Sequence, residues 1–243
     1  MYENFADIYD ELFPVSEAQK AFFISLAENM SSPKNLLDVG CGTGELAITL
    51  DSYFNYIAAI DLDYSMIAKA VPKKHSHHLD FKQMNMRSIA SVYFDGSFSA
   101  ISCLGNTLVH LQSSLDIQLF INSCHQLLRK NGKLILQIMN YDKILHQNIT
   151  TLDNIENQLY LFERQYQIIN TEKIIFRTIV TSKKTKEQKI SETNLYPLIS
   201  KDLISLLKDS GFENLKLYDA FTKNPFTIDS AVLIIEANSI SKS

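Results

Sequence analysis

The sequence predicts an α/β protein with a doubly wound, mostly parallel sheet, followed by a stretch of antiparallel strands. Between residues 34 and 140, short apolar runs of strand length alternate with segments that have the apolar spacing of helices. Between about residues 158 and 197, polar and apolar residues alternate with a period of two, which is typical of antiparallel strands with one wet face. Right-handed βαβ crossovers would join the strands of the first part.

Turn and capping signals divide the first part into elements. Ser16 would cap a helix that runs to Met30, and residues 31–33 would end it. Asn131 and Gly132 give a later helix a C-terminal stop. We expect strands at about residues 35–39, 56–60, 79–84, 98–104 and 133–138, and helices at about residues 44–52, 64–70 and 113–129.

The second part begins after Tyr141, where the pattern changes. The alternating strands have a charged hairpin tip at 181–186. Ser200 would then cap a helix through Lys208, and Gly211 would end it. Two apolar strands, at about residues 213–219 and 230–237, would close the chain.

The composition fits one large domain without a membrane segment. The chain has 243 residues, of which 46% are hydrophobic, and no apolar run approaches the ~18 residues that a membrane helix needs. Lysine and arginine number 23 against 27 acids, which disfavours nucleic acid because binding phosphates requires a basic face. Three cysteines without paired spacing, and no signal peptide, predict a cytoplasmic protein.

The segment LLDVGCGTGELAITL, residues 36–50, is the most informative in the chain. It predicts a strand, a tight glycine loop and a helix, whose N-terminus favours an anionic group. Gly40, Gly42 and Gly44 would let a ligand approach the backbone where a Cβ would clash. A dinucleotide site is disfavoured, because the spacing is GxGxG and Glu45 stands where that motif requires Gly or Ala. An ordinary strand-to-helix turn is the alternative.

With Asp38 two residues before the first glycine, DVGCGTG resembles motif I of the class I (seven-stranded) S-adenosylmethionine-dependent methyltransferases. The resemblance implies that the loop, with Cys41 as a small packing residue, wraps the amino acid end of the cofactor. S-adenosylhomocysteine would be its product. It also implies a sheet of order 3-2-1-4-5-7-6, with strand 7 antiparallel and a β insert between strand 5 and the last helix.

Asp61 stands at the end of the second expected strand. An acid there can accept hydrogen bonds from both hydroxyls of a ribose. In IDLDYSMIAKA, Asp61 and Leu62 match the family's second motif, and Met66 matches a residue that packs on the adenine. The alternative for Asp61 is a helix cap, a role that suits Asp63 better.

The segment FKQMNMR, residues 81–87, falls where the family reads the adenine edge. The carbonyl of Asn85 could accept a hydrogen bond from the adenine amino group. Met86 could cover the ring with a polarizable surface. A plain loop is the alternative.

The segment FSAISCLGNTLVHL, residues 98–111, resembles a signature of the glycine N-methyltransferases and related small-molecule enzymes. Carried over, Leu104, Gly105, Asn106 and His110 would line the reaction centre, with carbonyl oxygens beside the transferring methyl. Asn106 and His110 are thus the candidate catalytic residues, and His110 would also contact the cofactor. A core or capping role is the alternative for His110, and Ser99 departs from the aspartate that the family often has.

The segment NYDKIL, residues 140–145, also resembles that family, whose glycine-methylating members have an arginine immediately before it. Here Met139 occupies the position, and a thioether cannot pair with a carboxylate. The chain would therefore not methylate glycine unless another base substitutes, and Arg164 is the first candidate. Arg164, Tyr166 and Tyr196 are expected substrate contacts, with strand-surface residues as the alternative.

We therefore expect a methyltransferase that acts by in-line displacement on a small-molecule acceptor, preferably an amine. An oxygen acceptor would need a general base, for which His110 is the obvious candidate. A protein or RNA substrate, or a non-catalytic partner subunit that binds the cofactor, stay open. No metal is expected, because the HSHH run at 75–78 reads as a solvated loop.

The chain would form one domain, 1–243, as a monomer or homodimer. Its parts would be an N-terminal lid and helix at 1–30, a cofactor-binding core at 34–140, the β insert at 150–198 and closing elements at 199–238. The first fifteen residues are aromatic-rich, and Tyr9 and Tyr2 are the expected lid contacts with the cofactor.

Overall fold

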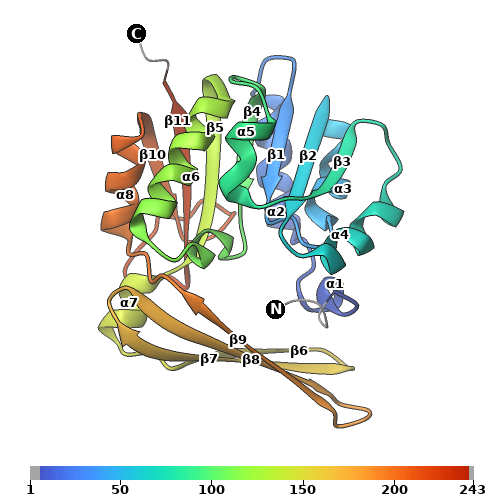
Figure 1. Cartoon of the computed structure of the whole chain (residues 1–243), viewed down its shortest axis with the longest axis vertical. Coiled ribbons are helices and arrows are strands. Elements are labelled where there is room, and N and C mark those ends of the chain that lie inside the picture. The colour runs from blue at the N-terminus through green and yellow to red at the C-terminus, as the bar shows by residue number, and fades with distance from the viewer. Residues whose placement is uncertain (1–5, 241–243) are drawn as a thin grey trace.

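Seven strands form a mixed sheet with helices on both faces, and a smaller antiparallel sheet lies across one end of it (Figure 1). This computed structural model describes residues 6–240. Residues 1–5, where the expected lid begins and which include the expected contact Tyr2, lie outside the described residues. The strands of the large sheet are β1 (Asn35–Val39), β2 (Tyr56–Asp61), β3 (Leu79–Gln83), β4 (Phe98–Cys103), β5 (Leu128–Met139), β10 (Phe212–Tyr218) and β11 (Val232–Ser239).

The expected strand order is confirmed. The order is β10-β11-β5-β4-β1-β2-β3, in which β1 to β5 are parallel. The last strand, β11, runs antiparallel to both β5 and β10. Strand β1 lies between β2 and β4, so the direction in which the chain winds reverses beside it. In such sheets a crevice opens at the carboxyl ends of the strands at this point.

Helices cover both faces of this sheet. Side chains of α2, α3 and α4 pack on one face together with Leu36, while those of α5, α6 and α8 pack on the other together with Leu37. None of the helices in the described part of the chain is long and apolar enough to cross a membrane. Their bounds are α1 (Tyr9–Leu12), α2 (Glu17–Glu28), α3 (Glu45–Leu50), α4 (Tyr64–Ala70), α5 (Ile89–Val92), α6 (Ser114–Leu127), α7 (Tyr141–His146) and α8 (Ser200–Asp209), with single 3₁₀ turns at Asp51–Tyr53, Val71–Lys73, Met86–Ser88 and Thr107–His110.

Two predicted caps are confirmed. The Ser16 hydroxyl accepts a hydrogen bond from the Gln19 N–H (3.1 Å) at the start of α2. The Asp63 carboxylate accepts one from the Ser65 N–H (2.9 Å) at the start of α4. Each side chain satisfies a backbone donor that the first turn of a helix leaves unpaired.

The expectation for residues 128–132 was wrong. Helix α6 ends at Leu127, and β5 begins at Leu128 rather than at Lys133. Asn131 has φ 60° and lies where the pairing of β4 with β5 shifts register. An Asn-Gly pair supplies a positive φ equally well to a helix end and to a strand irregularity. Here the structure uses it inside the strand.

The insert forms the second sheet. Its strands are β6 (Thr151–Glu156), β7 (Tyr160–Asn170), β8 (Lys173–Ser182) and β9 (Gln188–Leu195), each antiparallel to the next. Side chains of the N-terminal segment, Ile8 and Leu12, pack with Phe162 and Val180 of this sheet. The insert and the start of the chain therefore meet over the carboxyl ends of the parallel strands.

The expected cap on the last helix was also wrong. Ser200 is the first residue of α8, and Ile199 precedes it without a capping side chain. The Asp142 carboxylate of α7 instead accepts hydrogen bonds from the Ser200 N–H (2.8 Å) and hydroxyl (3.1 Å). Because α7 precedes the insert and α8 follows it, this contact ties together the two ends of the insert.

Replacing Asp142 with alanine should lower the free energy of unfolding by about 1–2 kcal/mol, because the first turn of α8 loses its acceptor. Urea titration at pH 7 measures this change. Asp209→Ala is the control, since its exposed carboxylate has only a 3.4 Å contact with the Ser205 hydroxyl. Equal losses in the two variants would contradict a capping role for Asp142.

Candidate functional site

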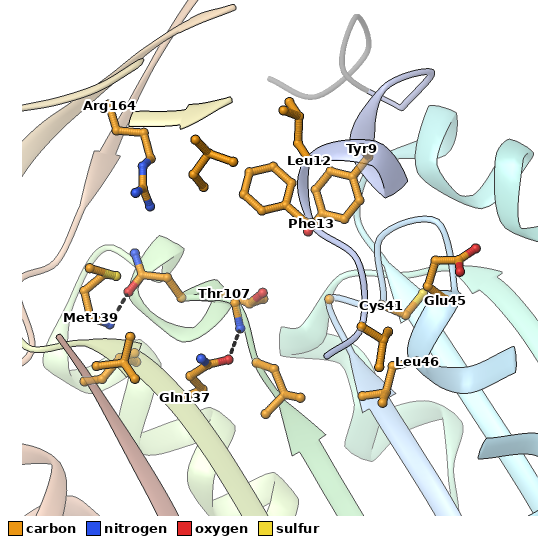
Figure 2. Close-up of a pocket in the computed structure, with 18 of the residues that line it drawn as sticks. Tyr9, Leu12, Phe13, Cys41, Glu45, Leu46, Thr107, Gln137, Met139 and Arg164 are labelled. Atoms are coloured by element: carbon orange, nitrogen blue, oxygen red, sulfur yellow. Dashed lines mark hydrogen bonds between the residues drawn. The ribbon is translucent and has the colours of Figure 1, made fainter. Parts of the chain in front are cut away.

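A cavity of about 500 Å³ lies where the carboxyl ends of β1, β4 and β5 face the insert. Figure 2 shows Arg164 and Met139 on one side of it and Cys41 and Glu45 on the other. Several parts of the chain contribute to its lining, among them the N-terminal segment (Tyr9, Leu12, Phe13), the end of β1 and the loop after it (Asp38, Gly40, Cys41, Thr43), the segments at the ends of β4 and β5 (Leu104, Gly105, Asn106, Thr107, His110, Gln137, Met139) and the insert (Leu152, Ile155, Phe162, Arg164, Tyr166, Phe176, Thr178).

The loop after β1 is fixed by its glycines. Gly40 has φ 74°, a conformation that favours glycine, and a Cβ there would lie 2.5 Å from the Thr107 side chain. The N–H groups of Gly40 and Cys41 both donate to the Ile60 carbonyl, at 2.8 and 2.9 Å. The loop is therefore held on β2 and packed directly against the loop after β4.

Asp38 places a buried carboxylate at this end of the cavity. Its side chain accepts a hydrogen bond from the Ser102 hydroxyl (2.8 Å), and the residue is only 3% exposed. Burial raises its pKa to about 6. A buried carboxylate without a cationic partner among the described residues is suited to a cationic ligand group.

Asp61 is held rigidly at the end of β2. Its carboxylate accepts hydrogen bonds from the N–H groups of Gly42 (2.9 Å) and Asp63 (2.9 Å). Burial raises its pKa, and these two hydrogen bonds oppose that shift. The two N–H groups set the carboxylate's orientation without using all of its acceptor capacity.

At the end of β4, Gly105 presents open backbone to the cavity. No atom lies within 4 Å of where its Cβ would stand, and its N–H donates to the Gln137 side chain (3.1 Å). Asn106 has φ 70°, and its side-chain amide forms hydrogen bonds with neighbouring parts of the chain. Its oxygen accepts from the Met139 N–H (3.0 Å), a bond drawn in Figure 2. Its nitrogen donates to the Tyr141 hydroxyl (3.0 Å).

His110 and Tyr166 are two further titratable residues of the cavity lining. Burial lowers the pKa of His110 to about 4, so its imidazole is neutral at neutral pH. Burial raises the pKa of Tyr166 to about 12, and its hydroxyl hydrogen-bonds that of Tyr141. Tyr166 thus extends the Asn106–Tyr141 pair to the insert.

The N-terminal segment closes over the glycine loop. The Tyr9 ring lies against Gly42, 3.0 Å from where a Cβ of that residue would stand. Asp10 accepts hydrogen bonds from the Thr43 hydroxyl and the Lys73 ammonium, which also pairs with Glu45 (2.6 Å). Phe13 continues the contact to the Phe162 ring of the insert, with 5.5 Å between ring centroids.

The structure brings one group of predicted residues together and leaves another outside the cavity lining. Tyr9, Asp38, Gly40, Cys41, Leu104, Gly105, Asn106, His110, Met139, Arg164 and Tyr166 line the cavity, whereas Gly42, Gly44, Asp61, Leu62, Met66, Asn85, Met86 and Tyr196 do not.

The second group lies mostly around the ends of β2 and β3. Leu62 is 65% exposed, Met66 is packed with Ile8, and Met86 packs on the main core. The side-chain carbonyl of Asn85 accepts a hydrogen bond from the Arg87 N–H (2.9 Å), so Asn85 caps the 3₁₀ turn that follows. Tyr196 lies after β9, where its N–H donates to the Val109 carbonyl (2.8 Å).

Several lining residues were missed. Gln137, Phe162, Phe176 and Thr178 carry no motif, but Phe162 is two residues before Arg164, so strand periodicity could have placed both on one face. No sequence signal could have paired Asp10 with Thr43.

Comparisons with known proteins agree with this geometry. The profile of the methyltransferase domain family matches residues 36–132. A Bacillus subtilis protein named as a methyltransferase, YqeM, is 30% identical over 169 residues, which is 67% of this chain and 66%, just under two thirds, of that relative. A glycine/sarcosine N-methyltransferase of Aphanothece halophytica is 25% identical over 90% of this chain and 82% of its own length.

A crystal structure of an S-adenosylmethionine-dependent methyltransferase from Clostridium acetobutylicum has the same fold, with a TM-score of 0.82. The superposition covers 99% of this chain and 99% of that chain, at 20% sequence identity. Residues 36–132 of this chain therefore match a methyltransferase domain, and the whole chain has the fold of that S-adenosylmethionine-dependent enzyme. S-adenosylmethionine is also the cofactor that the glycine loop indicated.

The residues of this methyltransferase chain fit that cofactor. The buried Asp38 carboxylate suits an ammonium group, and the missing Cβ of Gly105 leaves open space in the same cavity. Asp61 keeps free acceptor capacity for hydroxyl donors at the end of the neighbouring strand.

Asp38→Asn should change how the stability of the cofactor-free methyltransferase depends on pH. The folded pKa of about 6 exceeds the ~3.9 of an unfolded chain, so the folded state binds this proton more tightly. The contribution of Asp38 to stability is therefore complete below pH ~4 and is lost as pH rises through about 6. Asparagine does not ionise, so the variant should gain up to about 3 kcal/mol over the parent between pH 4 and 7.

Urea unfolding at several pH values without cofactor measures this difference. The exposed Asp80→Asn is the control for removing one acid from the chain. A stability difference between Asp38→Asn and the parent that is the same at every pH would show that burial does not raise the pKa of the Asp38 carboxyl.

Proposed function

We propose that the protein transfers a methyl group from S-adenosylmethionine to a small-molecule acceptor, specifically to an amine. The observation that carries this proposal is the single cavity that joins the Asp38 end of the glycine loop to a compartment under the insert. Its volume of about 500 Å³ is suited to small molecules, whereas a protein or RNA substrate would need an open groove. The name of the Aphanothece relative supports an amine acceptor.

The proposed binding residues follow the geometry. Asp38 would pair with the cofactor's ammonium, and the loop around Gly40 and Cys41 would wrap the cofactor's amino acid end. Asp61 would accept hydrogen bonds from the ribose hydroxyls. Leu62, Met66, Asn85 and Met86 would form the adenine side. When bound, S-adenosylmethionine supplies an electrophilic methyl group on a positively charged sulfur.

The residues beside that methyl are proposed to orient rather than react. Carbonyl oxygens at Leu104, Gly105 and Asn106 can make weak C–H···O contacts with a positively charged methyl. Asn106 would keep the β4 loop in place through Met139 and Tyr141. Alignment of the reacting atoms can lower a barrier by up to about 7–11 kcal/mol.

Closure would exclude water from the acceptor. The Asp10 contacts with Thr43 and Lys73 hold α1 on the glycine loop, and the insert covers the other side. A water-free compartment strengthens the electrostatic contacts within it and prevents side reactions.

Among the described residues, His110 and Tyr166 are poorly suited to act as a base, which favours nitrogen over oxygen as the acceptor atom. His110, with a pKa of about 4, is too weak to take a proton from a hydroxyl, and Tyr166, with a pKa of about 12, stays protonated. A neutral amine can attack without a base and lose its proton afterwards. His110 would then serve as a hydrogen-bond acceptor.

Replacing Asp61 with alanine should weaken cofactor binding about 10- to 100-fold, because two hydrogen bonds to a charged acceptor are lost. Calorimetry with S-adenosylhomocysteine measures the affinity. Asp80→Ala, which removes an exposed acid from the adjacent strand β3, is the control and should bind as the parent does. Parent-like affinity in Asp61→Ala would remove the ribose assignment.

Turnover is tested by S-adenosylhomocysteine release from a panel of amines, phenols and carboxylic acids. Product from amines alone supports the proposal. Product from phenols alone would replace nitrogen by oxygen as the acceptor atom. Cofactor binding without release from any acceptor would favour a non-catalytic partner subunit.

With an amine acceptor, kcat/KM should rise with pH and level off at the pKa of the free amine. The His110→Gln variant should keep the position of this profile while lowering its height, because glutamine retains a neutral hydrogen-bonding group. Rates measured between pH 5.5 and 9.5 give the profile. A titration step that disappears in His110→Gln would show that the imidazole acts as a base.

A further inference from the structure

Arg164 stands on the face of the insert that lines the cavity. It lies in β7 between Phe162 and Tyr166, and alternate residues of a strand share one face. Its partners across the sheet are Leu152 on β6 and Thr178 on β8, both of which also line the cavity. In Figure 2 its guanidinium points from the insert into the cavity, on the side where Met139 lies.

The guanidinium is short of partners. One terminal nitrogen donates to the Asp153 backbone carbonyl (2.6 Å), whereas Nε is buried and has no hydrogen-bond partner. No carboxylate lies within 4.0 Å of it in the part of the chain that the structure describes. Burial lowers the pKa of Arg164, but an arginine stays charged at neutral pH.

Arg164 is half-buried, and a buried N–H such as its Nε–H is costly to leave unpaired unless a ligand satisfies it. The guanidinium offers several donors in a planar fork, which matches the two oxygens of a carboxylate. Neither acid of the lining, Asp38 or Glu45, forms an ion pair with Arg164. Glu45 instead pairs with Lys73 and lies on the opposite side of the cavity with Cys41. The missing anion would therefore come with the ligand.

Most of the insert residues that line the cavity around Arg164 are apolar. Leu152, Ile155, Phe162 and Phe176 line the cavity with it, and the Phe162 ring centroid lies 6.0 Å from the guanidinium carbon. An acceptor as small as glycine would leave these side chains without contact. A hydroxyl-rich acceptor such as an amino sugar would place polar groups against them without partners.

We propose that the methyl acceptor is an amine that carries a carboxylate on an apolar, branched or aromatic body, and that Arg164 binds the carboxylate. This rests on the proposed function above, because it assigns the compartment under the insert to the acceptor. Arg164 is then the residue that determines specificity. It replaces on the insert a charge that Met139 cannot supply from β5.

Pairs of acids and their amides test the carboxylate directly. Calorimetry on the protein saturated with S-adenosylhomocysteine would compare phenylalanine with phenylalaninamide and 4-aminobenzoate with 4-aminobenzamide. The acid of at least one pair should bind about 10- to 100-fold more tightly than its amide, as expected for hydrogen bonds between charged groups. A parent protein that binds no acid in preference to its amide overturns the proposal.

The variants assign the preference to Arg164. Arg164→Gln should bind acid and amide equally, and Arg164→Lys should keep part of the preference because it keeps the charge. Arg177→Gln is the matched control: it changes an exposed arginine of the same sheet that is 3.8 Å from Glu192, and it should behave as the parent does. A full acid preference in Arg164→Gln overturns the assignment.

S-adenosylhomocysteine affinity, measured in the same titrations, reports whether each variant is folded. Turnover, measured on the same acids and amides, separates the two proposals. Acid preference without turnover of any panel member would contradict methyl transfer to these amines and leave the Arg164 site intact. Turnover of amides as fast as acids would contradict the Arg164 site and leave methyl transfer intact.

Discussion

The contact between two loops, after β1 and after β4, is the constraint on which the rest of the site depends. Gly40 can lie against Thr107 only because it has no Cβ. The first loop is also fixed to β2 through the Ile60 carbonyl, and the second to β5 through Gln137. Four neighbouring strands therefore define one rigid floor at the point where the winding of the sheet reverses. The cavity above it needs only a cover.

The cover and the floor have opposite charges. Asp38 lies in the floor of the cavity, and Arg164 extends into the cavity from the insert. Neither has an ionic partner among the described residues. A charge that is removed from water without a partner is unfavourable. Together the two residues give the compartment groups of opposite charge, which favour ligand groups of opposite sign. Apolar residues of the insert, such as Phe162 and Phe176, line the same cavity.

Much of this was accessible from the sequence, for identifiable reasons. The glycine loop and Asp61 belong to a local motif, and the strand order followed from the family that the motif indicated. Asn131 misled because the same backbone conformation ends helices and bends strands. The role of the Asn106 amide could not be predicted from the sequence, because its partners, the Met139 N–H and Tyr141, come near it only through the pairing of β4 with β5. Contacts between distant segments, such as Asp10 with Thr43, leave no local pattern.

The Asp142–Ser200 contact has a consequence for how such proteins diversify. It brings the chain back after the insert to almost the place where it departed. Everything between can then be lengthened, shortened or exchanged between relatives without moving the strands that hold the cofactor. A change of acceptor can therefore arise through substitutions in the insert between α7 and α8, while the parallel strands and the glycine loop keep their positions.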